Sequence, residues 1–368
     1  MTKELIKNHL RPLIFRARPE VCPDVAVWAK AHGIPVQELH PPVVNEIEPF
    51  ISDDPVARQE FETHYAVLVR PQSLVVIEKA VVRDSVGFVE LPDGKVCYEG
   101  NWWMPYLQNH PVYQRRFLKK RRQLAGNVYS LLCLWSAEFY HWFHDVLPRL
   151  EMALPHLPRD IKFLINEKPK EWQLHSLQAY GISPSQLEIQ PAGVHTTAGR
   201  LWFATPVGHA SLGSGRLIRQ VAGRLNRFWG ITTAGCARRR IYISRRKAAM
   251  RRVVNEVEVE PILKEQGFEI VMCEELSLRE QAGLFAEANV ICGPHGAGLT
   301  NMIYAQNKRV QIWELTASRQ TVPCYLVLSR QLGCEFRRPG GVEPADGMEG
   351  DMFWRGKAAD FKVLNERL

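Results

Sequence analysis

The stretch Cys292-Gly293-Pro294-His295-Gly296-Ala297-Gly298-Leu299-Thr300-Asn301 decides the fold expected for this chain. An apolar run at residues 288–291 precedes it and predicts a strand, and residues 299–305 predict a helix. The N–H groups at a helix start lack intrahelical acceptors, and the helix dipole adds partial positive charge there. Gly296 and Gly298 let a ligand approach the backbone closely. We therefore expect a phosphate-binding turn between a strand and a helix, with His295 as a further donor to the anion.

Strands and helices alternate along the whole second half of the chain. Apolar patterns and turn residues predict strands at 240–243, 268–272, 289–292 and 309–314, and helices at 217–229, 254–266, 277–287, 298–305 and 321–331. Such alternation with short loops is typical of a doubly wound parallel sheet. A Rossmann-like domain is therefore expected here.

Polar side chains occur where these strands end, and ligands bind at the carboxyl ends of such strands. Arginines suit a diphosphate, and a carboxylate at a strand end suits the hydroxyls of a ribose. Taken singly, Arg245 also fits a surface residue, His295 a buried core histidine and Glu314 a helix cap, so the prediction rests on joint placement. The expected nucleotide and phosphate site consists of Ser244, Arg245, Arg251, Asn255, Glu256, His295, Gly296, Ala297, Gly298, Thr300, Asn301 and Glu314.

The first half predicts a more mixed domain. A Pro-rich, irregular part extends to about residue 60, and segments 65–69, 74–78 and 87–91 predict consecutive antiparallel strands. After them come a helix at 137–153, a strand at 161–165, a helix at 171–180 and strands at 187–190 and 200–204. This pattern indicates an α/β domain with a β-rich insertion. We expect a first domain at 1–207, a nucleotide-binding domain at 208–338, and a segment at 339–368 that packs back on the first domain.

The helix expected at 137–153 carries His141 and Asp145 four residues apart. Residues at this spacing share one helix face, so the imidazole can hydrogen-bond the carboxylate. A carboxylate beside a polar partner can take a proton from a hydroxyl, which makes His141 and Asp145 the catalytic candidates. His144 is expected to project elsewhere, where it is a candidate for a second polar contact. The alternative is a core helix in which Asp145 pairs with Arg149. No third metal ligand stands out and no D-x-D pair exists, so no metal or other cofactor is expected.

Length and composition limit the class of protein. The 368 residues are too many for one ordinary core, and no apolar run is long enough to span a membrane. The N-terminus lacks the pattern of a signal peptide, and the eight scattered cysteines are typical of reduced thiols, so a cytoplasmic location is expected.

The net charge is +8. If helical, the basic residues in 115–122 form an amphipathic segment that suits an anionic membrane surface; the alternatives are a solvated helix face or the edge of an anion site. No nucleic-acid motif is present.

Three blocks of this sequence resemble glycosyltransferase family 61, whose bacterial members are often described as capsular polysaccharide biosynthesis proteins. They are residues 141–149; Tyr242-Ile243-Ser244-Arg245 with Arg251, Asn255 and Glu256; and residues 295–301 with Glu314-Leu315. The resemblance implies a GT-B fold, in which two Rossmann-like domains face a cleft and the C-terminal one holds the nucleotide sugar. It also implies an inverting, metal-independent reaction. The family's candidate catalytic Asp corresponds to Asp145, its phosphate-contacting Arg to Arg245, and its loop donors to His295, Gly296 and Ala297.

We therefore expect an enzyme that moves a sugar from a nucleotide diphosphate sugar, with UDP as the expected nucleotide, to a hydroxyl of a glycan or glycolipid acceptor in surface polysaccharide biosynthesis. Asp145 would act as the base, and the enzyme would work in the cytoplasm with peripheral contact to the inner membrane face. Two alternatives stand beside this hypothesis: a nucleotide-sugar-binding protein without catalysis, and a basic membrane- or polyanion-binding protein. The second predicts salt-sensitive binding without preference for a uridine nucleotide.

Overall fold

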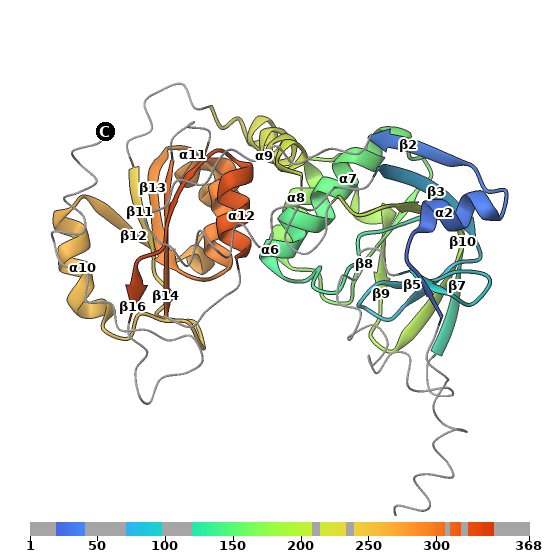
Figure 1. The fold of residues 1–368 in the computed structure, drawn as a ribbon, viewed down its shortest axis with the longest axis horizontal. Helices are drawn as coiled ribbons and strands as arrows, with labels where there is room; N and C mark the ends of the chain where they lie inside the picture. The colour runs from blue at the N-terminus through green and yellow to red at the C-terminus, as the bar shows by residue number, and fades with distance from the viewer. Residues whose placement is uncertain are drawn as a thin grey trace, which may run out of the picture. The chain divides into compact units, whose positions relative to one another are not determined.

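The computed structural model describes residues 20–40, 71–97, 120–207, 214–232, 239–305, 310–317 and 323–341. These residues form two compact units, the first up to Val207 and the second from Ser214 onward (Figure 1). Each unit combines helices with a sheet that contains parallel strands, as predicted. The strand expected at 65–69 lies outside the described residues, as does the segment 339–368 apart from its first three residues.

The sheet of the first unit is organised around its longest pair of strands. β10 (Val194–Ala204) pairs in parallel with β7 (Lys120–Ser130) along one edge. Along its other edge β10 pairs antiparallel first with β4 (Val81–Arg83) and then with β3 (Gln72–Glu78). The expected segments 74–78 and 87–91 therefore do not pair with each other in sequence order. The remaining strands are β1 (Val21–Cys22), β2 (Val36–His40), β5 (Phe88–Glu90), β6 (Val96–Cys97), β8 (Lys162–Asn166) and β9 (Leu187–Gln190).

The parallel part of this sheet has the order β10-β7-β8-β9. The chain moves outward from β7 to β8 and β9, and then returns to the opposite side of β7 as β10. The order of the strands therefore reverses between β7 and β10. In open parallel sheets such a reversal is a switch point, and ligands bind there beyond the carboxyl ends of the strands.

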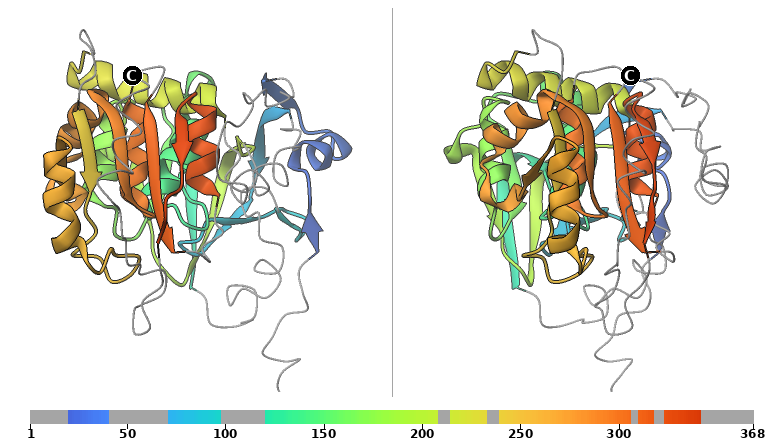
Figure 2. Two further views of the ribbon diagram at one scale, coloured as in Figure 1. Left: turned by 60° about the vertical axis from the view of Figure 1, so that its left-hand side comes forward. Right: turned by 90° about the vertical axis from the view of Figure 1, so that its left-hand side faces the viewer.

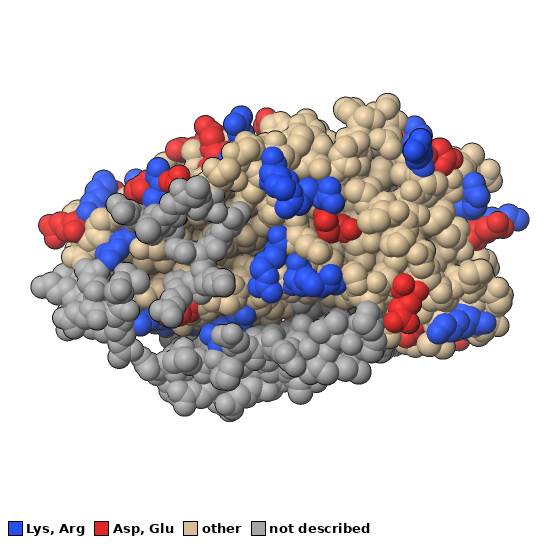
Figure 3. Space-filling model, turned by 90° about the horizontal axis from the view of Figure 1, so that it is seen from above, with Lys and Arg blue, Asp and Glu red and all other residues tan. Residues whose placement is uncertain are grey.

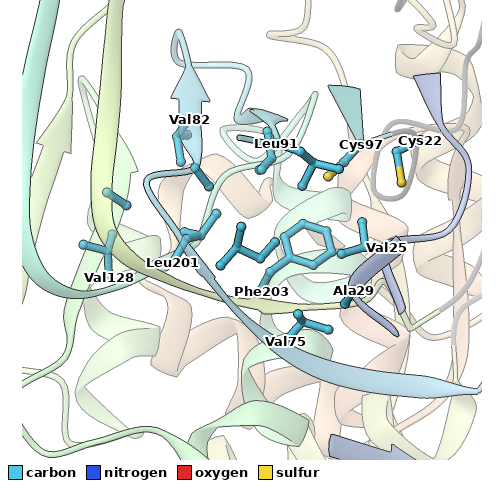
Figure 4. Packing of buried hydrophobic residues seen from close by; sticks show 14 of the residues in the cluster. Cys22, Val25, Ala29, Val75, Val82, Leu91, Cys97, Val128, Leu201 and Phe203 are labelled. Carbon is cyan, nitrogen blue, oxygen red and sulfur yellow. The ribbon is translucent and has the colours of Figure 1, made fainter. Parts of the chain in front are cut away.

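Both faces of the first sheet are covered. Helix α2 (Val25–Ala31) packs on one face against side chains such as Val75 and Leu201, in the cluster drawn in Figure 4. Trp202 and Tyr129 are neighbours in the register of β10 and β7 and point to the other face, which carries the helical segment that follows β7. The alternation of side chains along a strand explains why consecutive residues serve opposite faces.

That helical segment is not a regular α-helix. The expected helix at 137–153 consists of α6 (Phe139–His141), a π-helical segment η1 (Trp142–Val146) and α7 (Leu147–Ala153). Pro148 lacks the N–H that would donate to the carbonyl of His144, which removes one α-helical bond next to the widened turn. π-Helical turns of this kind occur frequently at functional sites. α8 (Glu171–Gln178) follows after β8.

The second unit has a parallel, doubly wound sheet, as predicted from the alternation of strands and helices (Figure 2). Its order is β12-β11-β13-β14-β15, and the short β16 (Gly340–Gly341) pairs with the end of β14. The strand order reverses between β11 and β13, which is the switch point of this unit. The strands are β11 (Arg239–Ile243), β12 (Phe268–Val271), β13 (Ala288–Pro294), β14 (Gln311–Ala317) and β15 (Glu335–Arg337).

Helices cover both faces of the second sheet. α10 (Glu256–Glu265) buries Val259 and Leu263 against Tyr242, Val290 and Trp313 on one face. The other face carries α9 (Gly215–Trp229), α11 (Leu278–Ala286) and α12 (Cys324–Gln331), of which α9 contacts the other two. The segment expected as a helix at 298–305 is a 3₁₀ helix, η5 (Ala297–Tyr304).

The helical conformation considered for residues 115–122 does not occur at the start of β7. The described residues Lys120, Arg121 and Arg122 begin this strand. The guanidinium of Arg122 donates to the hydroxyl of Thr196 at 2.8 Å and to the carbonyl of Ile189 at 2.7 Å. Pairing with β10 decides the conformation here, and sequence periodicity does not reveal it. Residues 115–119 lie outside the described residues.

Two further expectations concern membranes and cysteines. Within the described ranges, no helix combines the length and the apolar character that crossing a membrane requires. The seven cysteines in those ranges are free thiols, and all except Cys273 are buried.

Replacement of Gly87 by Ala should destabilise the first unit. Gly87 has a φ of +71°, and an added Cβ would lie 2.4 Å from Cβ of Leu132. We expect the free energy of unfolding to fall by about 2–4 kcal/mol, from backbone strain together with the clash. Gly94→Ala is the matched control, because its φ is +86° but no atom lies within 4 Å of the added Cβ. Urea unfolding of both variants should show a clearly larger loss for Gly87→Ala, and equal losses would contradict the packing described.

Candidate active site

The first candidate cluster lies at the switch point of the first unit. Residues 131–138 leave the carboxyl end of β7 and lead directly into α6 and η1. This connection places His141 and Asp145 in the first two turns of the helical segment, close to the edge where ligands bind in parallel sheets.

The Asp145 carboxylate is held by two imidazoles. Nδ1 of His141 lies 2.7 Å from Oδ2 of Asp145, which confirms the predicted hydrogen bond between the two. Nδ1 of His144 lies 2.8 Å from Oδ1, so the expectation that His144 projects elsewhere is wrong. The alternative pairing of Asp145 with Arg149 is also wrong, because that guanidinium donates to the carbonyls of Ser130 and Leu132. The π-helical turn changes the angular spacing on which both of these expectations relied.

Exposure and charge differ sharply within this cluster. The side chain of Asp145 is 33% exposed and that of His141 20%, whereas that of His144 is 2% exposed. Burial opposes ionisation of the Asp145 carboxyl, but hydrogen bonds from His141 and His144 outweigh it and hold its pKa well below the ordinary value. Asp145 is therefore an ionised, doubly hydrogen-bonded carboxylate.

Aromatic rings fix both imidazoles. The ring of Trp135 lies 4.9 Å from that of His141, and the ring of Tyr140 stacks on His144 at 4.8 Å with an interplanar angle of 16°. These contacts limit rotation of the imidazoles about their side-chain bonds. The cluster of His141, His144 and Asp145 is therefore set in one arrangement.

The second candidate cluster lies at the switch point of the second unit. Parallel pairing of β11 with β13 puts the ends of both strands side by side. A Cβ added to Gly296 would lie 2.1 Å from Nη1 of Arg245, so the guanidinium rests directly on the glycine backbone. Nε and Nη2 of Arg245 donate to the carbonyls of Arg251 and Met250, each at 3.1 Å. The residues around Arg245 and those around Gly296, about fifty positions apart in the sequence, are thus in direct contact.

The loop after β13 presents backbone donors beside this guanidinium. The first bond of η5 runs from the N–H of Leu299 to the carbonyl of Gly296 at 3.0 Å. The N–H groups of Ala297 and Gly298 precede that bond, so they are available to an anion. Gly298 also lets the loop pass Ile243, since an added Cβ would lie 2.8 Å from Cγ2 of that residue.

His295 is part of a buried charge network. Its Nδ1 lies 2.5 Å from Oε1 of Glu314, and Oε2 of Glu314 accepts from Nη2 of Arg338 at 3.1 Å. Glu314 was expected at a strand end, but it lies inside β14 and its side chain is fully buried. Both of its oxygens are engaged with protein cations or donors. Its observed contacts orient His295 and Arg338.

The structure places the remaining predicted residues in contacts within the protein, around the loops of the second cluster. The Glu256 carboxylate accepts hydrogen bonds from the hydroxyls of Tyr242 at 2.9 Å and Ser244 at 2.8 Å, so Ser244 and Glu256 are hydrogen-bond partners. Asn301 donates to Oε1 of Gln281 at 2.9 Å. The other three are Thr300, which is fully buried, Asn255, which precedes α10 and donates to Glu258, and Arg251, which has a φ of +57°.

Three participants were missed by sequence reasoning. His144 was available in the same motif, but an ideal helix directs it away from Asp145. Arg338 follows β15 in the way that Arg245 follows β11, yet that short strand had not been predicted. Gln281 sits inside α11, and nothing in its sequence context marks it as a partner of Asn301. Within the described ranges, no three His, Cys, Asp or Glu side chains are grouped so as to hold a metal ion.

The lowered pKa of Asp145 predicts how stability depends on pH. A carboxyl whose pKa is depressed in the folded state stabilises that state above its unfolded pKa of about 4, and the contribution is lost as pH falls through the folded value. The free energy of unfolding of the wild type should therefore exceed that of Asp145→Asn at pH 5, and the difference should shrink toward pH 3. Urea unfolding at several pH values measures it. A difference that grows below pH 4 would contradict the hydrogen bonding of Asp145.

A known family model covers residues of both clusters. The model of the family described as Glycosyltransferase 61 matches residues 139–312, which include the His141–Asp145 pair, Arg245 and the loop from His295 to Asn301. Glu314 and Arg338 lie beyond the end of the matched residues. No curated protein matches the chain. Residues 139–312 are thus a glycosyltransferase family 61 domain, and the chain is a glycosyltransferase.

Proposed function

We propose that this glycosyltransferase moves a sugar from a UDP-linked donor to a hydroxyl of a glycan or glycolipid, with inversion at the anomeric carbon and without a metal ion. The observation that carries the proposal is the contact of the Arg245 guanidinium with the backbone of Gly296 at the switch point of β11 and β13. It joins a cation, backbone donors and a helix start at the edge of the sheet where nucleotides bind.

The second unit would hold the donor diphosphate. Arg245 and the N–H groups of Ala297 and Gly298 would share its charge, and His295 would donate to the departing phosphate or to the sugar beside it. Loss of one such donor costs on the order of a hundredfold in rate. Metal independence is supported by this set of positive groups, which can supply the neutralisation that a divalent cation supplies elsewhere.

The first unit would supply the base. We propose a GT-B arrangement in which the two units face each other across a cleft, so that the His141–Asp145 pair meets the acceptor hydroxyl. Removal of the hydroxyl proton lets the oxygen attack the anomeric carbon from the side opposite the diphosphate, which inverts the configuration. A positioned base contributes about 10²–10⁴-fold.

The setting we propose is bacterial surface polysaccharide biosynthesis, in the cytoplasm and with peripheral contact to the anionic inner membrane face. α9 supports the membrane contact, because its outer face carries exposed Arg216, Arg219 and Arg227 and the helix contains no acidic residue. Figure 3 shows Lys and Arg side chains gathered in the middle of its view. Each basic residue close to an anionic surface contributes about 1 kcal/mol to binding.

Gly296→Ala tests the donor site without removing a functional side chain. The added Cβ would meet the far end of a flexible arginine, so the fold should persist while the guanidinium moves. We expect UDP affinity, measured by calorimetry, to fall about 10–100-fold, as it should for Arg245→Ala. Gly283→Ala is the matched control, with open space around the added Cβ.

The same titration separates the alternatives. Unchanged affinity of Gly296→Ala for UDP would overturn the donor site. Affinity of the wild type abolished by a chelator would overturn the metal-free reaction, and equal affinity for UDP and inorganic phosphate would favour a general polyanion binder.

Charge reversal on α9 tests the membrane contact. Arg216→Glu with Arg227→Glu should reduce cosedimentation with vesicles containing phosphatidylglycerol at least tenfold and leave UDP affinity unchanged. Arg159→Glu with Arg200→Glu changes the net charge equally at exposed positions of the first unit and serves as the control. Equal loss in both double variants would contradict a role for α9.

A further inference from the structure

We propose that the proton acceptor in this reaction is Nε2 of His141, and that Asp145 and His144 are positioning residues. The inference rests on the proposed sugar transfer and assigns its base. It reverses the expectation that Asp145 itself takes the proton.

The contacts of Asp145 argue against a direct role. Oδ2 accepts from His141 and Oδ1 accepts from His144, at 2.7 and 2.8 Å, so each oxygen already has a strong partner. A proton added to either oxygen would remove the negative charge that strengthens both hydrogen bonds. The depressed pKa of the Asp145 carboxyl points the same way, because a weak base is poorly matched to a sugar hydroxyl.

The geometry of His141 suits a base. When Nδ1 donates its hydrogen to Asp145, the neutral ring carries its proton there and Nε2 keeps its lone pair. The His141 side chain is 20% exposed and Trp135 lies against its ring, so rotation of the ring is limited while part of the side chain stays open to an acceptor. A carboxylate behind the ring also stabilises the imidazolium that forms on proton transfer, as in hydrolase triads.

His144 completes the arrangement but cannot reach an acceptor. Its side chain is 2% exposed and stacked on Tyr140. Nε2 of His144 is buried and has no hydrogen-bond partner among the residues that the structure describes. Among the residues that the structure describes, the one hydrogen bond of the His144 side chain runs to Asp145. Its role is therefore to hold the second oxygen of the carboxylate, so that the first stays aimed at His141.

The proton and electron balance is simple. The acceptor O–H bond breaks and its proton goes to Nε2 of His141. The oxygen uses the freed electron pair to form the bond to the anomeric carbon, and the bond from that carbon to the diphosphate oxygen breaks, leaving its pair on the diphosphate. The imidazolium then releases its proton to solvent, and Asp145 remains ionised throughout.

Steady-state transfer by four variants tests the assignment. His141→Ala should lower kcat about 10²–10⁴-fold while leaving UDP affinity unchanged. Added imidazole should raise kcat of this variant at least tenfold. His144→Phe, which can keep the stacking on Tyr140, should lower kcat with KM unchanged. His144→Asn should recover much of that loss, because its amide nitrogen can replace Nδ1. His175→Ala, at a half-exposed histidine of α8, is the control and should retain full activity.

A second readout does not depend on activity. In ¹⁵N NMR of histidine-labelled protein, neutral His141 should be the Nδ1–H tautomer, and Asp145→Asn should reduce that preference. An Nε2–H tautomer in the wild type would overturn the assignment, as would His141→Ala with more than a tenth of wild-type kcat or without imidazole rescue. Failure of the wild type to bind UDP or to transfer sugar would instead sink the proposed function, so the two failures are distinguishable.

Discussion

Parallel pairing of β11 with β13 is the interaction on which the second candidate cluster depends. The register sets Tyr242 opposite Cys292, and therefore brings the residues that follow each strand to the same edge. That close approach is possible only because Gly293, Gly296 and Gly298 lack a Cβ, since each added atom would lie within 3 Å of Ile243 or Arg245. The glycines thus allow the two loops to lie in contact and also allow a ligand to approach the backbone.

Carboxylates with two partners recur at both switch points. Asp145 is shared by two imidazoles, and Glu314 is shared by an imidazole and a guanidinium. A buried charge is costly unless it is paired and hydrogen-bonded, so the fully buried Glu314 requires both of its contacts. The consequence is functional, because such a carboxylate holds a neighbouring histidine in one orientation and in one protonation pattern.

Both clusters lie at a switch point between parallel strands, but the sheets of the two units differ. In the second unit the whole sheet is parallel and α/β alternation accounts for it. In the first unit four parallel strands are joined to an antiparallel part through β10, which pairs with β7 on one edge and with β3 and β4 on the other. The antiparallel strands extend the core around α2, while the parallel strands provide the switch point beside His141.

Much of the site could be predicted from sequence because local rules decide it. The turn at residues 293–298, the strand before it, the Arg after β11 and the i, i+4 spacing of His141 and Asp145 follow from glycine, apolar runs and helix geometry. β7 could not be predicted in this way, since its basic start is stabilised by contacts to Thr196 and Ile189 that lie about seventy residues away. Long-range pairing leaves no local signal.

The sequence by itself determined the family, the alternating architecture of the second half and the identity of the candidate site residues. Only the tertiary structure decided which of those residues form hydrogen bonds or contacts with one another. The π-helical turn brought His144 onto Asp145, the interior position of Glu314 turned a presumed strand-end group into a partner of His295, and the Gly296 backbone received Arg245. The physical reason is that hydrogen-bond partners and burial depend on the meeting of distant segments, whereas residue type and spacing do not.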